Sequence, residues 1–137
     1  MPAADPPARD SDPSTVQPPI GELWVDVRTV GVGTVLAVRG EIDMRTAPTL
    51  AEYVNRHFDG TADAARRPLV FDLTEVAFLG SAGLGVLLAA RQRAIAEDAT
   101  VWVVAASRAV SRPIQVTGLT GLLNLVSDLA SALDAMA

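Results

Sequence analysis

The spacing of apolar residues, which changes along the chain between a strand-like and a helix-like period, constrains the fold more than any other feature. Two runs rich in β-branched residues, 23–28 and 34–39, flank the turn formed by Gly31, Val32 and Gly33, which predicts an antiparallel hairpin. The segments after the hairpin alternate between helical spacing and short apolar runs. Because strands joined through helices pair in parallel with right-handed crossovers, we expect one mixed sheet covered by helices.

The elements expected after the hairpin follow from spacing, caps and turn residues. Helices are expected over about 47–58, 82–97 and 128–136, buried strands over 68–73 and 100–105, and a short edge strand over 123–126. Another helix should begin with Ser111 as N-cap and Pro113 in its first turn, because a proline deep in a helix costs about 3 kcal/mol; Gly118 should end it. Thr46 and Ser127 should cap the helices that follow them. The expected class is α/β, with about four or five strands and about four helices.

The first twenty residues differ from the rest of the chain. They hold six of the nine prolines and show no periodicity, so we expect a disordered tail over 1–20 and a single domain over 21–137. Asp5, Asp10 and Asp12 interrupt any apolar stretch there, so we do not expect this segment to be a signal peptide. Since no run of about 18 apolar residues occurs, we also expect no membrane contact and a cytoplasmic location.

The composition excludes several kinds of chemistry. The chain has no cysteine, a single histidine at position 57, and only arginines among its 11 basic residues. Disulfides, thiolate catalysis and lysine chemistry are therefore absent, and neither a cofactor nor a metal site is expected. The net charge of -5 argues against direct nucleic-acid binding. His57 and the pair Arg66-Arg67 are expected at the surface, and Asp72 at the end of its strand.

A glycine-rich stretch at 80–85 lies between an expected strand and an expected helix. Its glycines do not have the G-x-G-x-x-G spacing of a dinucleotide site, and Leu79 occupies the position where a nucleophile elbow needs glycine. A serine at the start of a helix remains. The unpaired N–H groups and the positive dipole there tolerate a phosphate on Ser81. The alternative is that Ser81 is an ordinary N-cap.

Two other features could belong to the same surface. Asp43 and Thr46 lie in the other turn that leads from a strand into a helix, so Asp43 could lie beside Ser81. The first half of the helix after Ser81 is apolar nearly all round, which indicates burial on more than one side or an exposed interface.

Three motifs give the chain a resemblance to a known family. The motifs comprise 40–43 with Thr46, Ala47, Pro48 and Leu50; 70–73 with Val76, Phe78, Leu79, Ser81, 83–85 and Leu88; and Val110, Arg112 and 117–119. In their joint spacing the chain resembles the bacterial anti-sigma factor antagonists, which are built on the STAS domain shared with the tails of sulfate transporters. The resemblance spans about 23–137.

The resemblance implies a function for the serine. In that family, the serine that matches Ser81 is phosphorylated by an anti-sigma factor that is a serine kinase. The unphosphorylated form binds the anti-sigma factor and frees the sigma factor; phosphate blocks binding, and a phosphatase restores it. The resemblance implies partner contacts by the residues of the two turns, which are Asp43, Thr46, Gly80, Ser81, Ala82, Gly83 and Leu84.

The chain departs from the family at two positions. Gly80 stands where the family commonly has Asp, so a carboxylate beside the phosphorylation site is missing, and Pro113 lies in a helix that the family normally keeps unbroken. Two alternatives to the switch are open. One is a constitutive STAS adaptor subunit without phosphorylation, and the other is a small nucleotide-binding or hydrolytic enzyme.

Overall fold

The computed structural model describes residues 16–136, which form a five-stranded mixed sheet with helices on both faces. The strands are β1 (Leu23–Val30), β2 (Gly33–Ile42), β3 (Leu69–Leu79), β4 (Val101–Val104) and β5 (Leu125–Val126), and the helices are α1 (Ala47–Phe58), α2 (Ala62–Ala65), α3 (Ser81–Ala96), α4 (Arg108–Val116) and α5 (Leu129–Met136). Strand order follows chain order, with β1 antiparallel to β2 and the other pairs parallel. The predicted fold class is confirmed. The tail predicted over 1–20 falls largely outside the described residues.

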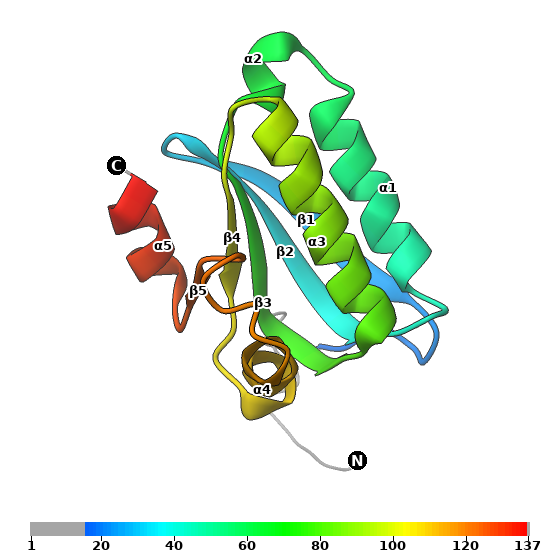
Figure 1. Cartoon of the computed structure of the whole chain (residues 1–137). Coiled ribbons are helices and arrows are strands. Elements are labelled where there is room, and N and C mark those ends of the chain that lie inside the picture. The colour runs from blue at the N-terminus through cyan, green and yellow to red at the C-terminus, as the bar shows by residue number, and fades with distance from the viewer. Residues whose placement is uncertain (1–15, 137) are drawn as a thin grey trace.

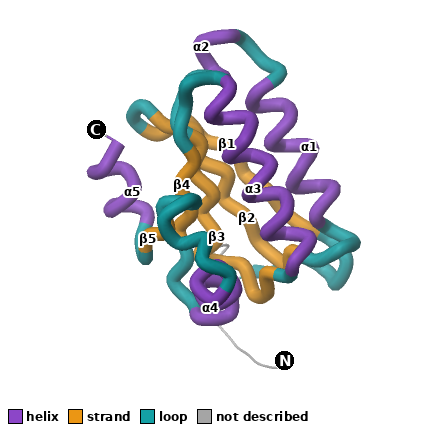
Figure 2. Tube along the Cα trace, viewed as in Figure 1, coloured by secondary structure: helices purple, strands orange, loops and turns teal. Residues whose placement is uncertain are grey.

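The sheet separates two layers of helices. In Figure 1, α1 and α3 lie together over one face, α5 lies over the other, and α4 closes the end at which β3 finishes; Figure 2 shows the strands between these helices. Side chains that alternate along β2 contribute to a core on each face of the sheet. Leu36 belongs to the large core under α1 and α3, whereas Val35 belongs to the small core under α5. No helix in residues 16–136 combines the length and apolarity needed to cross a membrane.

A bulge makes β3 longer than the predicted strand 68–73. The register between β2 and β3 shifts just after Asp72, where β3 carries an extra residue. The Asp72 carboxylate accepts hydrogen bonds from the N–H and the hydroxyl of Thr74. The main-chain N–H of Thr74 at the bulge therefore has a hydrogen-bond partner. The strand therefore continues to Leu79, and Asp72, expected at the strand's end, lies inside it.

The prediction for the start of α4 is wrong. The helix begins after Ser107, and Pro113 lies in its interior rather than in its first turn. Val110 and Ile114, one turn apart, are both fully buried in the large core. Burying this pair on one helix face outweighs the hydrogen bond that Pro113 cannot make.

The predicted end of α4 is confirmed, whereas the predicted cap of α5 is wrong. Gly118, with φ at +75°, ends α4 as predicted. At α5, Asp128 rather than Ser127 serves as the cap, because its Oδ1 accepts the N–H of Ser131 at 2.7 Å. This hydrogen bond lowers the pKa of Asp128.

Two residues expected at the surface are tied into the fold. The Arg67 guanidinium donates to the carbonyls of Gly31 and Gly33 at 3.0 and 2.9 Å, which holds the turn of the hairpin. His57 is half-buried beside it, and its Nε2 has no hydrogen-bond partner among residues 16–136. Burial lowers the pKa of His57. The two hydrogen bonds of Arg67 join segments that are 34 and 36 residues apart in the sequence, so local patterns could not reveal them.

Candidate functional site

The turns that follow β2 and β3 are neighbours. Ile42 and Leu79, the last residues of the two strands, face each other in register. Gly80 then donates its N–H to the Ile42 carbonyl at 2.9 Å. Asp43 and Ser81 each lie within two residues of this pair, so the register brings the two predicted turns to one end of the sheet.

Ser81 is the first residue of α3 and not its cap. Gly80 holds the N-cap position in an extended conformation, and the N–H of Leu84 donates to the Gly80 carbonyl as the first helical bond. The alternative that Ser81 is an ordinary N-cap is therefore wrong. Ser81 is exposed, and its hydroxyl makes no hydrogen bond within the described part of the chain. The N–H groups of Ser81, Ala82 and Gly83 precede the first helical bond, where the helix dipole favours negative charge.

Gly83 sets how closely α3 approaches the sheet. A Cβ at this position would lie 2.5 Å from Leu79 Cδ1 and 2.6 Å from Ile42 Cγ2, closer than carbon atoms can approach. Glycine therefore lets the first turn of α3 rest directly on the paired strand ends. This contact fixes the place at which Ser81 reaches the surface.

The Asp43 turn is held by internal hydrogen bonds. Asp43 Oδ1 accepts the N–H groups of Arg45 and Thr46 at 2.9 and 3.2 Å, and Oδ2 accepts the Arg45 guanidinium at 2.9 Å. The bond from the Arg45 side chain, aided by these N–H groups, holds the pKa of Asp43 below its ordinary value of 3.8. The carboxylate is therefore ionised at neutral pH.

Thr46 supports the turn from inside. It is only 2% exposed, and its hydroxyl donates to the Glu41 carbonyl at 2.6 Å and accepts the N–H of Asp43 at 3.0 Å. Thr46 occupies the N-cap position of α1, as predicted, although its side chain makes no hydrogen bond to the helix N–H groups. Pro48 lies in the first turn of α1, as predicted.

Large apolar side chains are exposed around Ser81. Met44, in the Asp43 turn, is 84% exposed, and Phe78, at the end of β3, is 47% exposed. The Phe78 ring approaches Gly80 so closely that a Cβ there would lie 3.0 Å from its Cε2. Exposed apolar groups beside a polar centre are typical of a protein-docking surface. The sequence analysis missed Met44, because nothing in a turn sequence reveals such exposure.

An apolar groove of about 580 Å³ runs between α1 and α3 and reaches Ala82, next to Ser81. Its lining residues are mostly small: Ala51, Val54, Asn55, Ala82, Gly85, Val86, Ala89, Gln92, Arg93 and Ala96. A second stripe of α3, comprising Gly83, Leu87, Ala90 and Ala94, is buried against the sheet. The apolar residues of this helix thus form one face that is buried against the sheet and another that lines the exposed groove.

These features define the chain as a small mixed-sheet α/β domain with two neighbouring strand-to-helix turns. The family model for the STAS domain matches residues 25–132. The chain therefore belongs to the STAS domain family, as the resemblance of its motifs implied.

Relatives within this family carry related names. The chain is 38% identical over 99 residues to the anti-sigma-F factor antagonist RsfB of Mycobacterium tuberculosis, covering 72% of this chain and 77% of that protein. The crystal structure of an anti-sigma factor antagonist from Mycobacterium paratuberculosis matches with a TM-score of 0.75 at 36% identity, covering 88% and 97% of the two chains. SpoIIAA in its unphosphorylated form matches with a TM-score of 0.67 at 19% identity over 82% and 96%, which supports the fold alone.

Proposed function

We propose that this chain is an anti-sigma factor antagonist that is switched by phosphorylation of Ser81. The unphosphorylated form binds an anti-sigma factor with serine-kinase activity and thereby releases a sigma factor, whereas phosphate on Ser81 blocks binding until a phosphatase removes it. The domain acts in the cytoplasm without contacting nucleic acid or membrane directly. The exposed, unbonded Ser81 hydroxyl at the start of α3 carries the proposal, and the names of the relatives support the class of partner.

The partner contacts divide into touching and supporting residues. Asp43, Gly80, Ser81, Ala82 and Leu84 are at least partly exposed and face the partner. Thr46 and Gly83 are buried and act by holding the two turns in place. The exposed Met44 and Phe78 supply apolar area, and the groove from Ala82 along α3 extends it.

The switch follows from charge at this surface. A phosphate adds about -1.5 to -2 charges at pH 7, close to Asp43, which is already ionised. Docking would then have to remove both anions from water beside apolar side chains, which is strongly unfavourable. Since a helix N-terminus accommodates an anion, the phosphate leaves the fold intact and acts on binding.

Gly80 changes the surroundings of the phosphorylation site. The carboxylate that the family commonly places at this position is absent, and the Phe78 ring occupies part of the space that its Cβ would need. Of the two turns, only that of Asp43 contributes a carboxylate. We therefore expect kinase recognition here to depend more on Asp43 and on apolar contacts.

Binding of Ser81 variants to the purified anti-sigma factor kinase of the same genome tests the proposal. Ser81→Ala should bind about as tightly as wild type, because it adds no charge and breaks no hydrogen bond within the described residues that could disturb the site. Ser81→Asp should bind at least about tenfold more weakly, which corresponds to about 1.4 kcal/mol. Ser131→Asp is the matched control, since Ser131 is also exposed near the start of a helix, α5 on the other face of the sheet. Equal binding by Ser81→Asp and wild type would refute the charge mechanism.

A further inference from the structure

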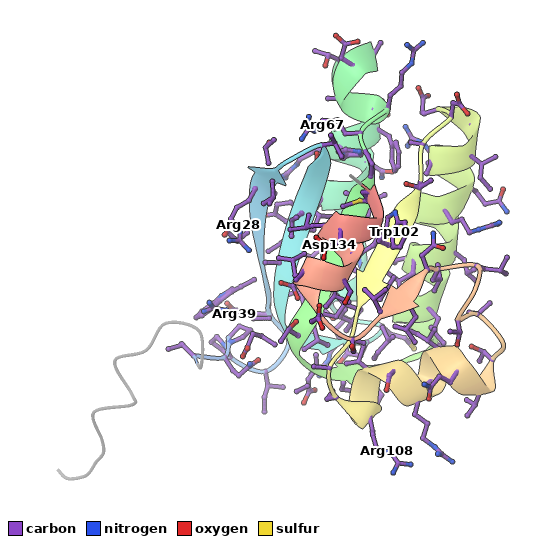
Figure 3. All side chains as sticks on the ribbon, turned by 90° about the vertical axis from the view of Figure 1, so that its left-hand side faces the viewer. Arg28, Arg39, Arg67, Trp102, Arg108 and Asp134 are labelled. Atoms are coloured by element: carbon purple, nitrogen blue, oxygen red, sulfur yellow. The ribbon has the colours of Figure 1, made fainter. Side chains whose placement is uncertain are left out.

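The outermost strand β1 has an open edge. Among the described residues it pairs with β2 alone, and its eight residues contain no proline and no bulge. Figure 3 shows Arg28 on this strand at the margin of the sheet. A long, regular edge without such blocking features is a template for another strand.

The hairpin turn determines which main-chain groups face the open edge. The two-residue turn after Val30 makes Val30 and its partner a hydrogen-bonded pair, and such pairs alternate along an antiparallel ladder. The N–H and C=O groups of Val25, Val27 and Thr29 therefore point away from β2. Thr34, which faces Thr29, supports this alternation. Its N–H points away from β1 and donates to the Pro68 carbonyl, just before β3, at 2.9 Å.

The charges on β1 favour a second copy of the same strand. Asp26 and Arg28 are exposed on one face, with 3.6 Å between the Arg28 Nε and the Asp26 Oδ2. If Val27 faces Val27 of another copy in an antiparallel pair, Asp26 faces Arg28 of that copy, and the two-fold axis repeats this pair. A slip of two residues either way, which keeps the parity, puts Asp26 opposite Asp26 or Arg28 opposite Arg28. Like charges directly opposite each other destabilise a sheet, so the charges select one register.

Apolar side chains fit the same register. Val27 is 52% exposed and Trp24 is 40% exposed. In this register Val27 packs on its own copy, and Trp24 faces Val30. Val27 also lines a hollow of about 270 Å³ with Tyr53 and His57, which the second copy would partly cover.

We propose that two copies of this chain form a two-fold dimer by antiparallel pairing of their β1 strands around Val27. The pairing adds about six main-chain hydrogen bonds, two for each facing pair among Val25, Val27 and Thr29. It also exchanges the two Asp26–Arg28 contacts within strands, one in each copy, for two contacts between strands. The surface lies on the sheet edge and uses neither Ser81 nor Asp43.

Charge reversal combined with sedimentation equilibrium tests the dimer. The wild-type chain of 14.3 kDa should reach twice this mass as its concentration rises. Asp26→Arg and Arg28→Asp should each weaken self-association about tenfold, because two attractive pairs become repulsive. An equimolar mixture of the two variants should restore the dimer, and so should the double variant that carries both changes. Far-ultraviolet circular dichroism confirms that each variant is folded.

Two kinds of result would contradict the dimer. A wild-type chain that keeps a mass of 14.3 kDa up to millimolar concentration overturns it. Single variants that associate like wild type, or a mixture that stays monomeric, overturn the register and with it the proposal. None of these results depends on Ser81, so they leave the proposed function untouched.

Discussion

Replacing Gly83 by alanine should destabilise the protein, whereas the same change at Gly85 should stabilise it. Both glycines lie near the start of α3, so each alanine gains up to about 1 kcal/mol of helix propensity. At Gly83 the new methyl group would lie 2.5 Å from Leu79 Cδ1 and 2.6 Å from Ile42 Cγ2. At Gly85 the new methyl group would meet no atom within 4 Å beyond its chain neighbours and the backbone of its own helix. The pair of substitutions therefore separates packing from propensity.

The magnitude follows from these two terms. Overpacking of this kind costs about 1–3 kcal/mol, because neighbouring side chains or the helix must shift. After the propensity gain, Gly83→Ala should lower the free energy of unfolding by about 0–3 kcal/mol, and Gly85→Ala should raise it by up to about 1 kcal/mol. The difference between the variants, about 1–3 kcal/mol, is the packing term alone.

Equilibrium unfolding in urea measures both values. With unchanged m-values, the shift in midpoint gives the change in free energy of unfolding directly. If Gly83→Ala proves as stable as Gly85→Ala, the close contact with the strand ends does not position α3, and the account of how Ser81 reaches the surface fails.

Four other perturbations have expected outcomes. Pro113→Ala should raise the free energy of unfolding by about 1–3 kcal/mol in urea, since it restores a helical N–H; an unchanged value would show that α4 has adapted to the proline. Asp59→Ala, which removes a 2.8 Å ion pair with Arg93 at the surface, should cost less than about 1 kcal/mol in the same assay, and a larger loss would contradict this view of the pair. Gly85→Glu should weaken anti-sigma factor binding in a titration without lowering stability, because it places a charge in the groove between α1 and α3; unchanged binding would exclude the groove. Burial lowers the pKa of His57 below its ordinary 6.5, so the unfolded chain takes up the proton more readily and the free energy of unfolding should fall as the pH drops below 6.5. His57→Gln should make the free energy of unfolding, measured in urea, depend less on pH. Equal pH dependence in the variant and the wild type would show that His57 is not the cause.

Local patterns predicted most of the architecture. Alternation and the glycine turn gave the hairpin, and apolar spacing with Pro48 gave α1 over 47–58, the range that the structure shows. These signals lie within a few residues of each other, so they need no knowledge of tertiary contacts. The start of α4 was missed because the local penalty of Pro113 competes with the burial of Val110 and Ile114, which only the assembled core reveals.

The site was predicted in outline and missed in detail. The strand-to-helix order brought Asp43 and Ser81 to one end of the sheet, and the register of β2 with β3 agrees. The helix starts one residue earlier than predicted, which makes Gly80 the N-cap. The position of the first turn of α3 depends on how closely Gly83 fits against Leu79, and the spacing of residues in the sequence does not reveal this contact.

Phosphorylation and binding measured on one sample test the switch most directly. The chain is incubated with the anti-sigma factor kinase of the same genome and ATP, its intact mass and modified peptide are determined, and its retention by the anti-sigma factor is measured. We expect one phosphate, on Ser81, and loss of retention, whereas Ser81→Ala takes no phosphate and stays bound. An unmodified wild-type chain that stays bound would indicate a constitutive adaptor, and a chain phosphorylated on Ser81 that binds unchanged would contradict the switch.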